Sequence, residues 1–294
     1  MWMPTFEPWQ PRRKMSVVNV AITGASGLIG RRLLERLPAL GHTVRAIPRG
    51  AAVSECDAIV HLAGEPVAQR WTDAAKKRIY DSRVQGTRQL VSGLSQLSRR
   101  PNVLVCASAV GIYGSRGDEI LTEKSPVGSG FLPRVAIDWE ASARTAEPLG
   151  IRVISLRLGV VLARGGALAK LLPPFRLGAG GRLGSGRQWM SWIHIDDVVS
   201  LILSAMENAS LQGPVNATAP EPVTNADFTR ILAMTLHRPA IFPVPALALR
   251  LALGEMSQVL LDSQRVLPAA AQAARFTFQF PQLRSALENL LAAS

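Results

Sequence analysis

The feature that most constrains the fold of this chain is a glycine-spaced turn between an apolar run and a run of leucines at helical spacing. Residues 17–23 are mostly apolar, and the segment that follows has glycine at its first, fourth and seventh positions. A strand, a tight turn and a helix in this order are what a dinucleotide-binding βαβ unit requires. The residues of this predicted cofactor-binding turn are Gly24, Ala25, Ser26, Gly27, Leu28, Ile29 and Gly30. The alternative is a turn with a purely structural role.

The three glycines of the turn have separate predicted roles. Gly24 permits a sharp exit from the strand, and Gly30 lets the helix pack closely on the strand. Gly27 has no Cβ, so the backbone there can approach a pyrophosphate at the helix N-terminus. Binding of a dinucleotide cofactor is therefore favoured over the structural alternative.

Arg49 follows the second predicted strand and indicates which dinucleotide is bound. An enzyme that uses NAD(H) places an acid there for the ribose hydroxyls, but residues 43–50 contain no acid. An arginine can pair with a 2′-phosphate through two hydrogen bonds. NADP(H) is therefore favoured over NAD(H), the alternative being one more exposed arginine in an arginine-rich chain.

Strands and helices are predicted to alternate through the first half of the chain. Strands are predicted at residues 17–23, 43–47, 58–62, 103–107 and 151–156, and helices at 30–40, 73–97, 134–147 and 196–207. This order predicts an α/β fold with a Rossmann-type, doubly wound parallel sheet. A small, mainly helical C-terminal substrate lobe is predicted from helices at 225–236, 245–253 and 281–291.

The predicted domains follow from these elements. Residues 1–16 contain three prolines and precede the first strand, so we expect a disordered tail. Residues 17–164 form the predicted nucleotide-binding domain, completed by about 194–219. Residues 165–193 and 220–294 are the predicted substrate-binding loop and lobe. Within them, residues 165–186 are glycine-rich and contain Pro173 and Pro174, which predicts a loop with a short helix over 167–172.

Composition argues against several classes of protein. The net charge is +12, but the arginines are scattered and no basic run alternates with aromatics, so nucleic-acid binding is not expected. No apolar run approaches the roughly 20 residues of a membrane span. Cys56 and Cys106 lie in apolar strand-like runs, so we expect no disulfide and a cytoplasmic location. The four histidines and two cysteines show no metal-ligand spacing.

Several motifs together resemble the extended short-chain dehydrogenase/reductase superfamily. They are the glycine turn, His61-Leu62-Ala63-Gly64, Ser108-Ala109-Val110-Gly111-Ile112-Tyr113-Gly114, Leu156-Arg157-Leu158-Gly159 and Trp192-Ile193-His194-Ile195-Asp196-Asp197. Further segments resemble an atypical, epimerase-like branch that includes human short-chain dehydrogenase family 39U member 1 and bacterial nucleoside-diphosphate-sugar epimerase-like proteins. They include Asp81-Ser82-Arg83, Gly184-Ser185-Gly186-Arg187-Gln188-Trp189-Met190-Ser191 and Gln264-Arg265-Val266-Leu267-Pro268.

The resemblance implies a Rossmann fold and NADP(H), with further cofactor contacts. These contacts come from Leu62, Ala63 and Gly64 at a strand end and from Arg83 in the next helix. Catalysis is where this chain departs from the superfamily, which uses a serine, a tyrosine and a lysine four residues after the tyrosine. The matching positions here are Leu132 and Ala136, which cannot move a proton.

Ser108 and Tyr113 are the predicted catalytic residues. Ser108 occupies the serine position at a strand end and would orient a carbonyl. Tyr113 could replace the missing acid, although no lysine stands near it in the sequence to lower its pKa. The alternative is a packed tyrosine whose hydroxyl is hydrogen-bonded.

The predicted substrate contacts lie beside the glycine-rich stretch. Polar and aromatic groups are dense there, and such a segment can close over a ligand. The predicted contacts are Gln188, Trp189, Trp192 and His194, with Glu65 reaching the same cleft from the end of a strand. His194 could be an acid or base, but a role in positioning the loop is favoured.

Two functions of different classes remain in view. The first is an NADP(H)-binding epimerase or oxidoreductase acting on a small polar, for example sugar-like, metabolite. The second is a sensor or regulatory protein that binds NADP(H) with little or no turnover, which the missing tyrosine and lysine favour. The sequence leaves a homodimer open.

Overall fold

A six-stranded parallel sheet organises the structure, a computed structural model that describes residues 18–292. The sheet has the strand order β10-β6-β4-β3-β1-β2. Its strands are β1 (Asn19–Thr23), β2 (Thr43–Ile47), β3 (Ala58–His61), β4 (Val103–Ala109), β6 (Arg152–Leu158) and β10 (Gly213–Ala217). Strand β2 pairs with β1 on one side, and the chain then crosses back so that β3 pairs with β1 on its other side. The gap between β1 and β3 is therefore the topological switch point, where open α/β sheets bind ligands at the carboxyl ends of their strands.

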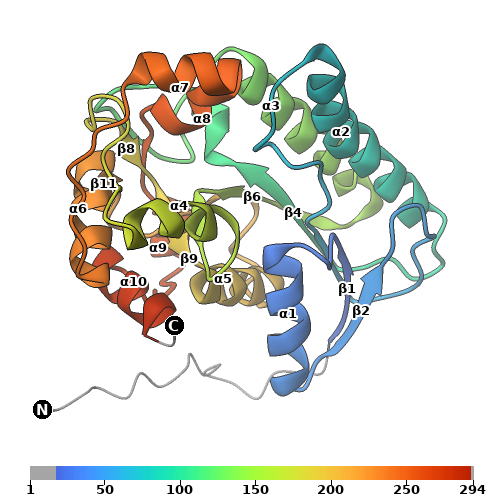
Figure 1. The fold of residues 1–294 in the computed structure, drawn as a ribbon. Helices are drawn as coiled ribbons and strands as arrows, with labels where there is room; N and C mark the ends of the chain where they lie inside the picture. Colours follow the sequence, from blue (N-terminus) through green and yellow to red (C-terminus); the bar gives the residue numbers. More distant parts are fainter. Residues whose placement is uncertain (1–17, 293–294) are drawn as a thin grey trace, which may run out of the picture.

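Two layers of helices cover the sheet (Figure 1). Helices α1 (Leu28–Ala39) and α5 (Ile195–Glu207) pack against each other on one face. Helices α2 (Asp73–Ser95) and α3 (Phe131–Arg144) form the pair on the other face. The strands β3 and β4 are buried almost throughout, as expected for a sheet covered on both faces.

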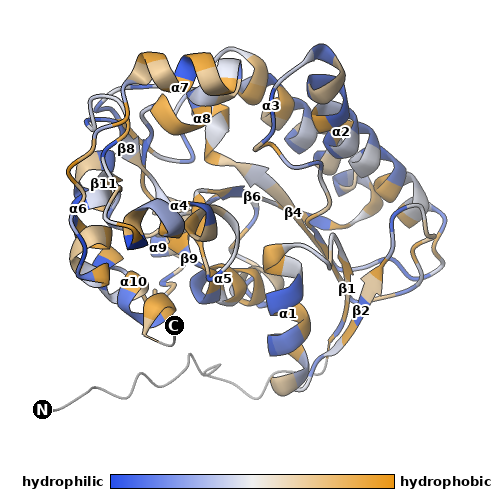
Figure 2. Cartoon of the chain, viewed as in Figure 1, coloured by the Kyte–Doolittle hydropathy of each residue, from blue (hydrophilic) through white to orange (hydrophobic). Residues whose placement is uncertain are grey.

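The C-terminal lobe has its own apolar core beside the sheet. This core lies between α4 (Gly166–Arg176), α6 (Asn225–Leu236) and α10 (Leu283–Leu291). The shorter helices of the lobe are α7 (Ala246–Leu253), α8 (Gln258–Leu261) and α9 (Ala269–Ala273). Helix α7 has no buried residue, and Figure 2 shows it as hydrophobic except for one hydrophilic stretch.

Three two-stranded pairings join distant parts of the chain. Strand β5 (Ile120–Leu121) pairs with β12 (Arg265–Val266), β7 (Val160–Leu162) with β9 (Trp192–His194), and β8 (Trp189–Met190) with β11 (Val223–Thr224). The β5–β12 pair links a loop after β4 to the C-terminal lobe. These pairings hold the lobe against the carboxyl ends of the sheet strands.

The predicted fold class is confirmed, and one local prediction is wrong. Strand 43–47 and helix 225–236 have the predicted bounds, whereas β4 and β6 each run two residues further than predicted. The predicted loop at Pro173 and Pro174 is instead part of α4. The helix survives two residues without N–H donors because Leu168, Leu172 and Phe175 are buried in the lobe core. The predicted tail at residues 1–16 lies outside the described residues.

His61 ties three elements together beneath the switch point. Its Nδ1 lies 2.6 Å from Oγ1 of Thr23 in β1, and its Nε2 lies 3.0 Å from Oγ1 of Thr87 in α2. The side chain is buried, and burial lowers the pKa of His61 to about 4. The folded protein therefore favours the neutral imidazole.

This burial predicts a loss of stability in acid. The pKa of His61 falls from about 6.5 in the unfolded chain to about 4 in the folded one. The free energy of unfolding is therefore not reduced by His61 above pH 6.5, and it decreases as the pH falls from 6.5 toward 4 because the unfolded chain binds the proton more tightly. The difference corresponds to up to about 3 kcal/mol. We expect the Tm of the parent to decrease more between pH 7 and pH 4.5 than the Tm of His61→Gln.

The comparison of the two proteins isolates His61 from other titrating groups. Burial lowers the pKa of His194 to about 4 and raises that of Asp197 to about 6, and both groups are present in parent and variant. Equal slopes of Tm against pH in the two proteins would contradict the assignment.

Candidate nucleotide-binding site and adjoining cavity

Two glycines of the turn are required by close backbone contacts. Gly24 has φ +70°, and a Cβ there would lie 2.6 Å from the carbonyl carbon of Leu62. A Cβ on Gly30 would lie 2.4 Å from the carbonyl oxygen of Gly24. Any larger residue at either position would push β1, the β3 end or α1 apart. These contacts agree with the roles predicted for the two glycines.

Gly27 differs because a Cβ there would meet a single backbone atom, at a longer distance than at Gly24 or Gly30. It has φ −72°, and a Cβ on Gly27 would have as its nearest neighbour the carbonyl oxygen of Gly24, at 3.2 Å. Gly27 is the N-cap of α1, whose first turn contains no acid. The amides of Leu28 and Ile29 have no acceptor within the helix. The turn is therefore an open cradle with N–H donors, and it fits a pyrophosphate.

Arg49 lies in an exposed turn directly after β2. The turn is closed by a hydrogen bond from the N–H of Ala51 to the carbonyl oxygen of Pro48. The Arg49 side chain is exposed, and among residues 18–292 it has no hydrogen-bond or ion-pair partner. Its guanidinium is therefore free to bind an anion.

Arg83 lies beneath Gly64 and forms no ion pair with a carboxylate of the described chain, although the charge of Glu65 partly stabilises its own. Its Nη1 donates to the carbonyl oxygens of Glu65 and Ile79, at 2.9 and 3.2 Å. Its guanidinium carbon lies 5.1 Å from the ring centroid of Trp139. Burial lowers the pKa of Arg83 to about 10, so it is still a cation at neutral pH. Leu62, Ala63 and Gly64 lie between this cation and the glycine turn, at the carboxyl end of β3.

Ser108 and Tyr113 belong to one buried network. The Ser108 hydroxyl donates to Oε1 of Glu140 at 2.7 Å, and Arg157 donates to both Glu140 oxygens at 2.8 and 2.9 Å. Arg157 Nη1 also donates to the Tyr113 hydroxyl at 2.9 Å. That hydroxyl in turn donates to Oδ1 of Asn216 at 2.8 Å. The network thus joins β4, α3, β6 and β10.

The network favours the packed-tyrosine interpretation of Tyr113. The tyrosine is fully buried, and burial raises its pKa, although Arg157 acts in the opposite sense. Ser108 is also buried, with its hydroxyl turned toward α3. Proton transfer by these two residues stays a prediction. Leu132 and Ala136 lie on α3, in agreement with their predicted match to the superfamily's catalytic helix.

A cavity of about 310 Å³ opens at the N-terminus of α3, and we call it the α3 cavity. It adjoins the end of β4, which pairs with β3 next to the glycine turn. Its walls come from the loop after β4, from the start of α3 and from the C-terminal lobe. The lining residues are Gly111, Tyr113, Gly114, Ser115, Arg116, Gly128, Ser129, Phe131, Leu132, Pro133, Gln258, Asp262 and Gln264.

Sequence reasoning missed the lobe side of this cavity. Gln258, Asp262 and Gln264 are about 130 residues from the start of α3 in the chain, and the β5–β12 pairing brings them there. The one available signal was the segment beginning at Gln264, which carried part of the family resemblance. No residue type or spacing marked Asp262.

The predicted substrate residues hold the lobe together in the structure. Gln188 donates to the carbonyl oxygens of Leu183 and Leu260, and the buried Trp192 donates to that of Glu221. None of the predicted set lines the α3 cavity. Substrate contacts by these residues stay a prediction.

The other three predicted substrate residues also have structural contacts. Trp189 donates from Nε1 to Asp118 at 2.7 Å. His194 is fully buried, accepts the N–H of Asp196 at the start of α5, and stacks on Phe280 at 3.9 Å between ring centroids. Glu65 accepts from Gln69 at 3.2 Å. The loop-positioning role favoured for His194 agrees with its contacts.

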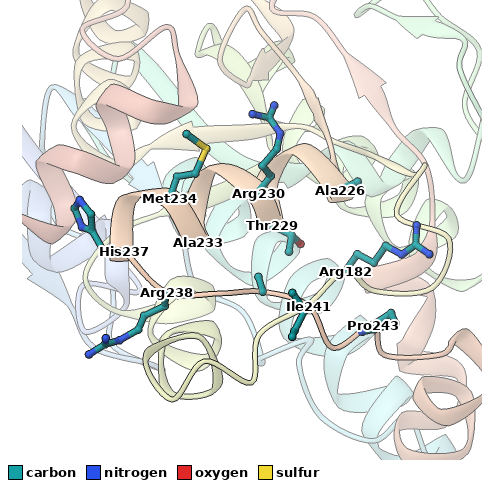
Figure 3. Close-up of a pocket in the computed structure, with 11 residues that line it drawn as sticks. Arg182, Ala226, Thr229, Arg230, Ala233, Met234, His237, Arg238, Ile241 and Pro243 are labelled. Carbon is teal, nitrogen blue, oxygen red and sulfur yellow. The ribbon is translucent and has the colours of Figure 1, made fainter.

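A larger cavity of about 630 Å³ lies within the lobe, between α6 and residues 238–243 (Figure 3). Its lining includes Arg182, Arg230, His237 and Arg238. Arg230 forms an ion pair with Asp227 at 3.0 Å. Figure 3 shows Arg230 and Arg238 pointing away from the groove. None of its lining residues belongs to the glycine turn or to the ends of the sheet strands.

Residues 18–292 contain neither a metal-binding cluster nor a membrane-spanning helix. No three His, Cys, Asp or Glu side chains of this part of the chain gather where they could hold a metal ion. Among its helices, none combines the length and the apolar character needed to cross a membrane. Cys56 and Cys106 are both buried free thiols.

The fold and the glycine turn define a Rossmann-type protein of the extended short-chain dehydrogenase/reductase class. Residues 20–217 match the NAD dependent epimerase/dehydratase family, and residues 244–290 match a domain of unknown function, DUF1731. The chain belongs to the NAD dependent epimerase/dehydratase family. The family resemblance expected from the motifs is confirmed.

Relatives place the chain in the epimerase-like branch of that class. The Epimerase family protein SDR39U1 homolog, chloroplastic, of Arabidopsis thaliana is 39% identical over 95% of this chain and 88% of its own. The Epimerase family protein YfhF of Bacillus subtilis is 37% identical over 94% of this chain and 98% of its own. The crystal structure of human SDR39U1 (isoform 2) with NADPH superposes on this chain with a TM-score of 0.90 at 32% sequence identity. The match covers 94% of this chain and 100% of the human one.

The different surroundings of Gly27 and Gly30 predict different effects of substitution. Gly27→Val places a side chain in the open cradle, so we expect a folded protein that no longer binds NADPH. Gly30→Val forces backbone atoms apart, so we expect loss of the fold itself. Circular dichroism and calorimetric titration with NADPH distinguish the two. A folded Gly27→Val that binds NADPH with the affinity of the parent would place the cofactor elsewhere.

Tyr113→Phe tests the buried network. The variant keeps the packed ring but leaves Arg157 Nη1 and Asn216 Oδ1 without their hydroxyl partner. We expect the free energy of unfolding to decrease by about 1–3 kcal/mol. Denaturant titration measures this, with Tyr80→Phe as the control because the Tyr80 hydroxyl donates to Asp138 at a less buried site. Equal losses in the two variants would argue against a special role for the network.

Proposed function

We propose that this chain binds NADP(H), with the pyrophosphate at the N-terminus of α1. The observation that carries the proposal is the open cradle at Gly27, where a Cβ would have one close protein neighbour, the carbonyl oxygen of Gly24 at 3.2 Å. The exposed Arg49 would bind the 2′-phosphate, and the unpaired cation of Arg83 would favour an anion near the end of β3. A relative that shares the whole fold is solved with NADPH.

We further propose that the protein acts as an epimerase or oxidoreductase on a small polar metabolite in the α3 cavity. Bound NADP(H) would supply hydride transfer to or from a carbon of that metabolite. The protein's part is to hold the metabolite beside the carboxyl ends of β3 and β4 and to exclude water. Leu132 and Phe131 would form the apolar wall of the cavity, and Ser115 and Ser129 part of its polar wall. Family membership and the position of the cavity support this proposal.

A second candidate is binding of NADP(H) without turnover, as in a sensor or regulatory protein. It is favoured by Leu132 and Ala136 at the positions where the superfamily has its tyrosine and lysine. It is also favoured by Tyr113, whose hydroxyl is already bonded to two partners and has no exposed surface.

One experiment separates the two candidates. NADPH binding is first measured by calorimetry, and NADPH consumption is then followed across a panel of small carbonyl compounds. An enzyme consumes NADPH with at least one compound, and Tyr113→Phe would lower kcat about 100-fold or more if Tyr113 donates the proton. Tight binding with no consumption across the panel supports the sensor. Absence of NADPH binding refutes both.

Two further expectations stay predictions. A homodimer is supported by the exposed apolar side chains of the lobe, since Leu247 and Leu251 of α7 are 67% and 74% exposed. A cytoplasmic location is supported by the two reduced, buried cysteines.

Arg49→Ala tests the choice of cofactor. The arginine would contact only the 2′-phosphate, which NADH lacks, so we expect NADPH affinity to decrease by about 1.5–3 kcal/mol and NADH affinity to be nearly unchanged. Calorimetric titration of both cofactors measures the difference. Arg230→Ala, an exposed arginine of the lobe, controls for the loss of one positive charge. Equal losses for NADPH and NADH in Arg49→Ala would contradict the assignment.

A further inference from the structure

Asp262 is the one acidic side chain that lines the α3 cavity in the described chain. It lies between α8 and β12 and is half-buried. Its backbone N–H donates to the carbonyl oxygen of Gln258 at 2.9 Å. Among residues 18–292 its carboxylate has no hydrogen-bond or ion-pair partner. A half-buried carboxylate in a cavity wall is available to a ligand when no donor of the protein already occupies its oxygens.

Among the described residues, the one cation in the cavity wall is Arg116, and it is already paired. Arg116 donates from Nε and Nη2 to both carboxylate oxygens of Glu119, at 2.9 and 2.7 Å. Its Nη1 donates to the carbonyl oxygen of Pro126 at 3.2 Å. The fork geometry of the guanidinium is thus used within the protein. A phosphate in the α3 cavity would meet the free charge of Asp262 and no free guanidinium. The uncapped N–H groups at the N-terminus of α3 are the one described feature of the wall that would attract it.

The remaining polar groups suit hydroxyl groups. Gln264 donates from Nε2 to the carbonyl oxygen of Gly114 at 3.2 Å, which leaves its amide oxygen as an acceptor. Gln258 contributes a second amide, and Ser115 and Ser129 contribute hydroxyls that can donate or accept. The ring of Phe131 supplies an apolar surface in the same wall. Amides, hydroxyls, a carboxylate and an aromatic ring together match a ligand that has hydroxyl groups on an apolar carbon frame.

The position of Asp262 is fixed from the neighbouring residue. The Ser263 N–H donates to the Ser115 hydroxyl oxygen at 3.1 Å, and the Ser263 hydroxyl donates to the carbonyl oxygen of Gly117 at 2.7 Å. The Arg116 N–H donates to the carbonyl oxygen of Ser263 at 2.8 Å. The β5–β12 pair joins the same two segments a few residues further along the chain. The backbone that carries Asp262 is therefore held in place before a ligand arrives, which reduces the entropy lost on binding.

The size of the cavity limits the ligand. Its volume of about 310 Å³ is at the lower end of the roughly 300–1,000 Å³ of small-molecule sites. A monosaccharide or a polyol of similar size fits such a volume better than a nucleoside diphosphate sugar does. Burial also raises the pKa of Asp262, in agreement with a carboxylate that lacks a cationic neighbour.

From these observations we propose that the α3 cavity binds a small, uncharged, hydroxyl-rich compound, and that Asp262 selects it by accepting hydrogen bonds from its hydroxyls. The same carboxylate disfavours phosphorylated and nucleotide-linked analogues. This inference rests on the proposed function in that the bound compound would be the metabolite presented to NADP(H). It gives the residues matched by the DUF1731 pattern a role, because they supply Asp262 to the cavity.

The test is a titration of the full chain with a defined panel, in the presence and absence of NADPH. The panel contains hexoses, pentoses and inositols, the monophosphates of each, and UDP-glucose. Binding is measured by calorimetry and by saturation-transfer NMR. We expect at least one uncharged member to bind more tightly than its phosphate and than UDP-glucose.

Asp262→Asn makes the test specific to the carboxylate. The variant keeps shape and an acceptor but removes the charge, so we expect affinity for the uncharged compound to decrease about tenfold, since hydrogen bonds to ionised acceptors are roughly twice as strong as neutral ones. NADPH affinity should be unchanged. Asp81→Asn, at a partly exposed aspartate of α2 that pairs with Lys77, is the control for loss of one carboxylate and should change neither affinity.

The outcomes separate this inference from the proposed function. Tighter binding of a phosphate or of UDP-glucose, no binding of any uncharged member, or unchanged affinity in Asp262→Asn would each overturn the inference, whatever NADPH does. Loss of NADPH binding in the parent chain would refute the proposed function, whereas binding of an uncharged compound that depends on Asp262 would still support the cavity assignment.

Discussion

The close approach of two backbone segments at the end of β1 is the contact on which the rest of the site depends. Gly24 lies so near Leu62 that no side chain fits between them, and Gly30 lies equally near Gly24. These contacts fix the N-terminus of α1 over the switch point between β1 and β3. The open cradle at Gly27 exists because its two neighbouring glycines are packed tightly and it is not. Helix, turn and strand end thus act as one rigid unit.

The buried ion pair between Arg157 and Glu140 joins β6 to α3, the helix that also carries Leu132 and Ala136. Both side chains are less than a tenth exposed, and their hydrogen bonds satisfy each other and reach Ser108 and Tyr113. A buried pair of this kind is costly to break because one charge would be left without a partner. The network therefore fixes the Tyr113 hydroxyl between Arg157 and Asn216 and joins four elements of the sheet region.

The C-terminal lobe completes the site by closing the α3 cavity. The hydrogen bonds of Ser263 and the β5–β12 pair bring Asp262 and Gln264 to the end of β4. Without this segment the cavity would have one wall from the loop after β4 and one from α3, and no free carboxylate. The glycine turn, made by local sequence, and the α3 cavity, made by distant segments, thus both lie at carboxyl ends of the sheet strands.

The sequence by itself determined the parallel sheet, the glycine turn and the position of Arg49. Each of these depends on residues close together in the chain, where periodicity and turn chemistry operate. Tertiary structure decided the rest. A helix runs across Pro173 and Pro174 because burial of neighbouring apolar side chains outweighed the two missing backbone N–H donors. Asp262 lies in a cavity with groups about 130 residues away in the chain. Contacts between distant segments depend on packing and strand pairing, which no local pattern records.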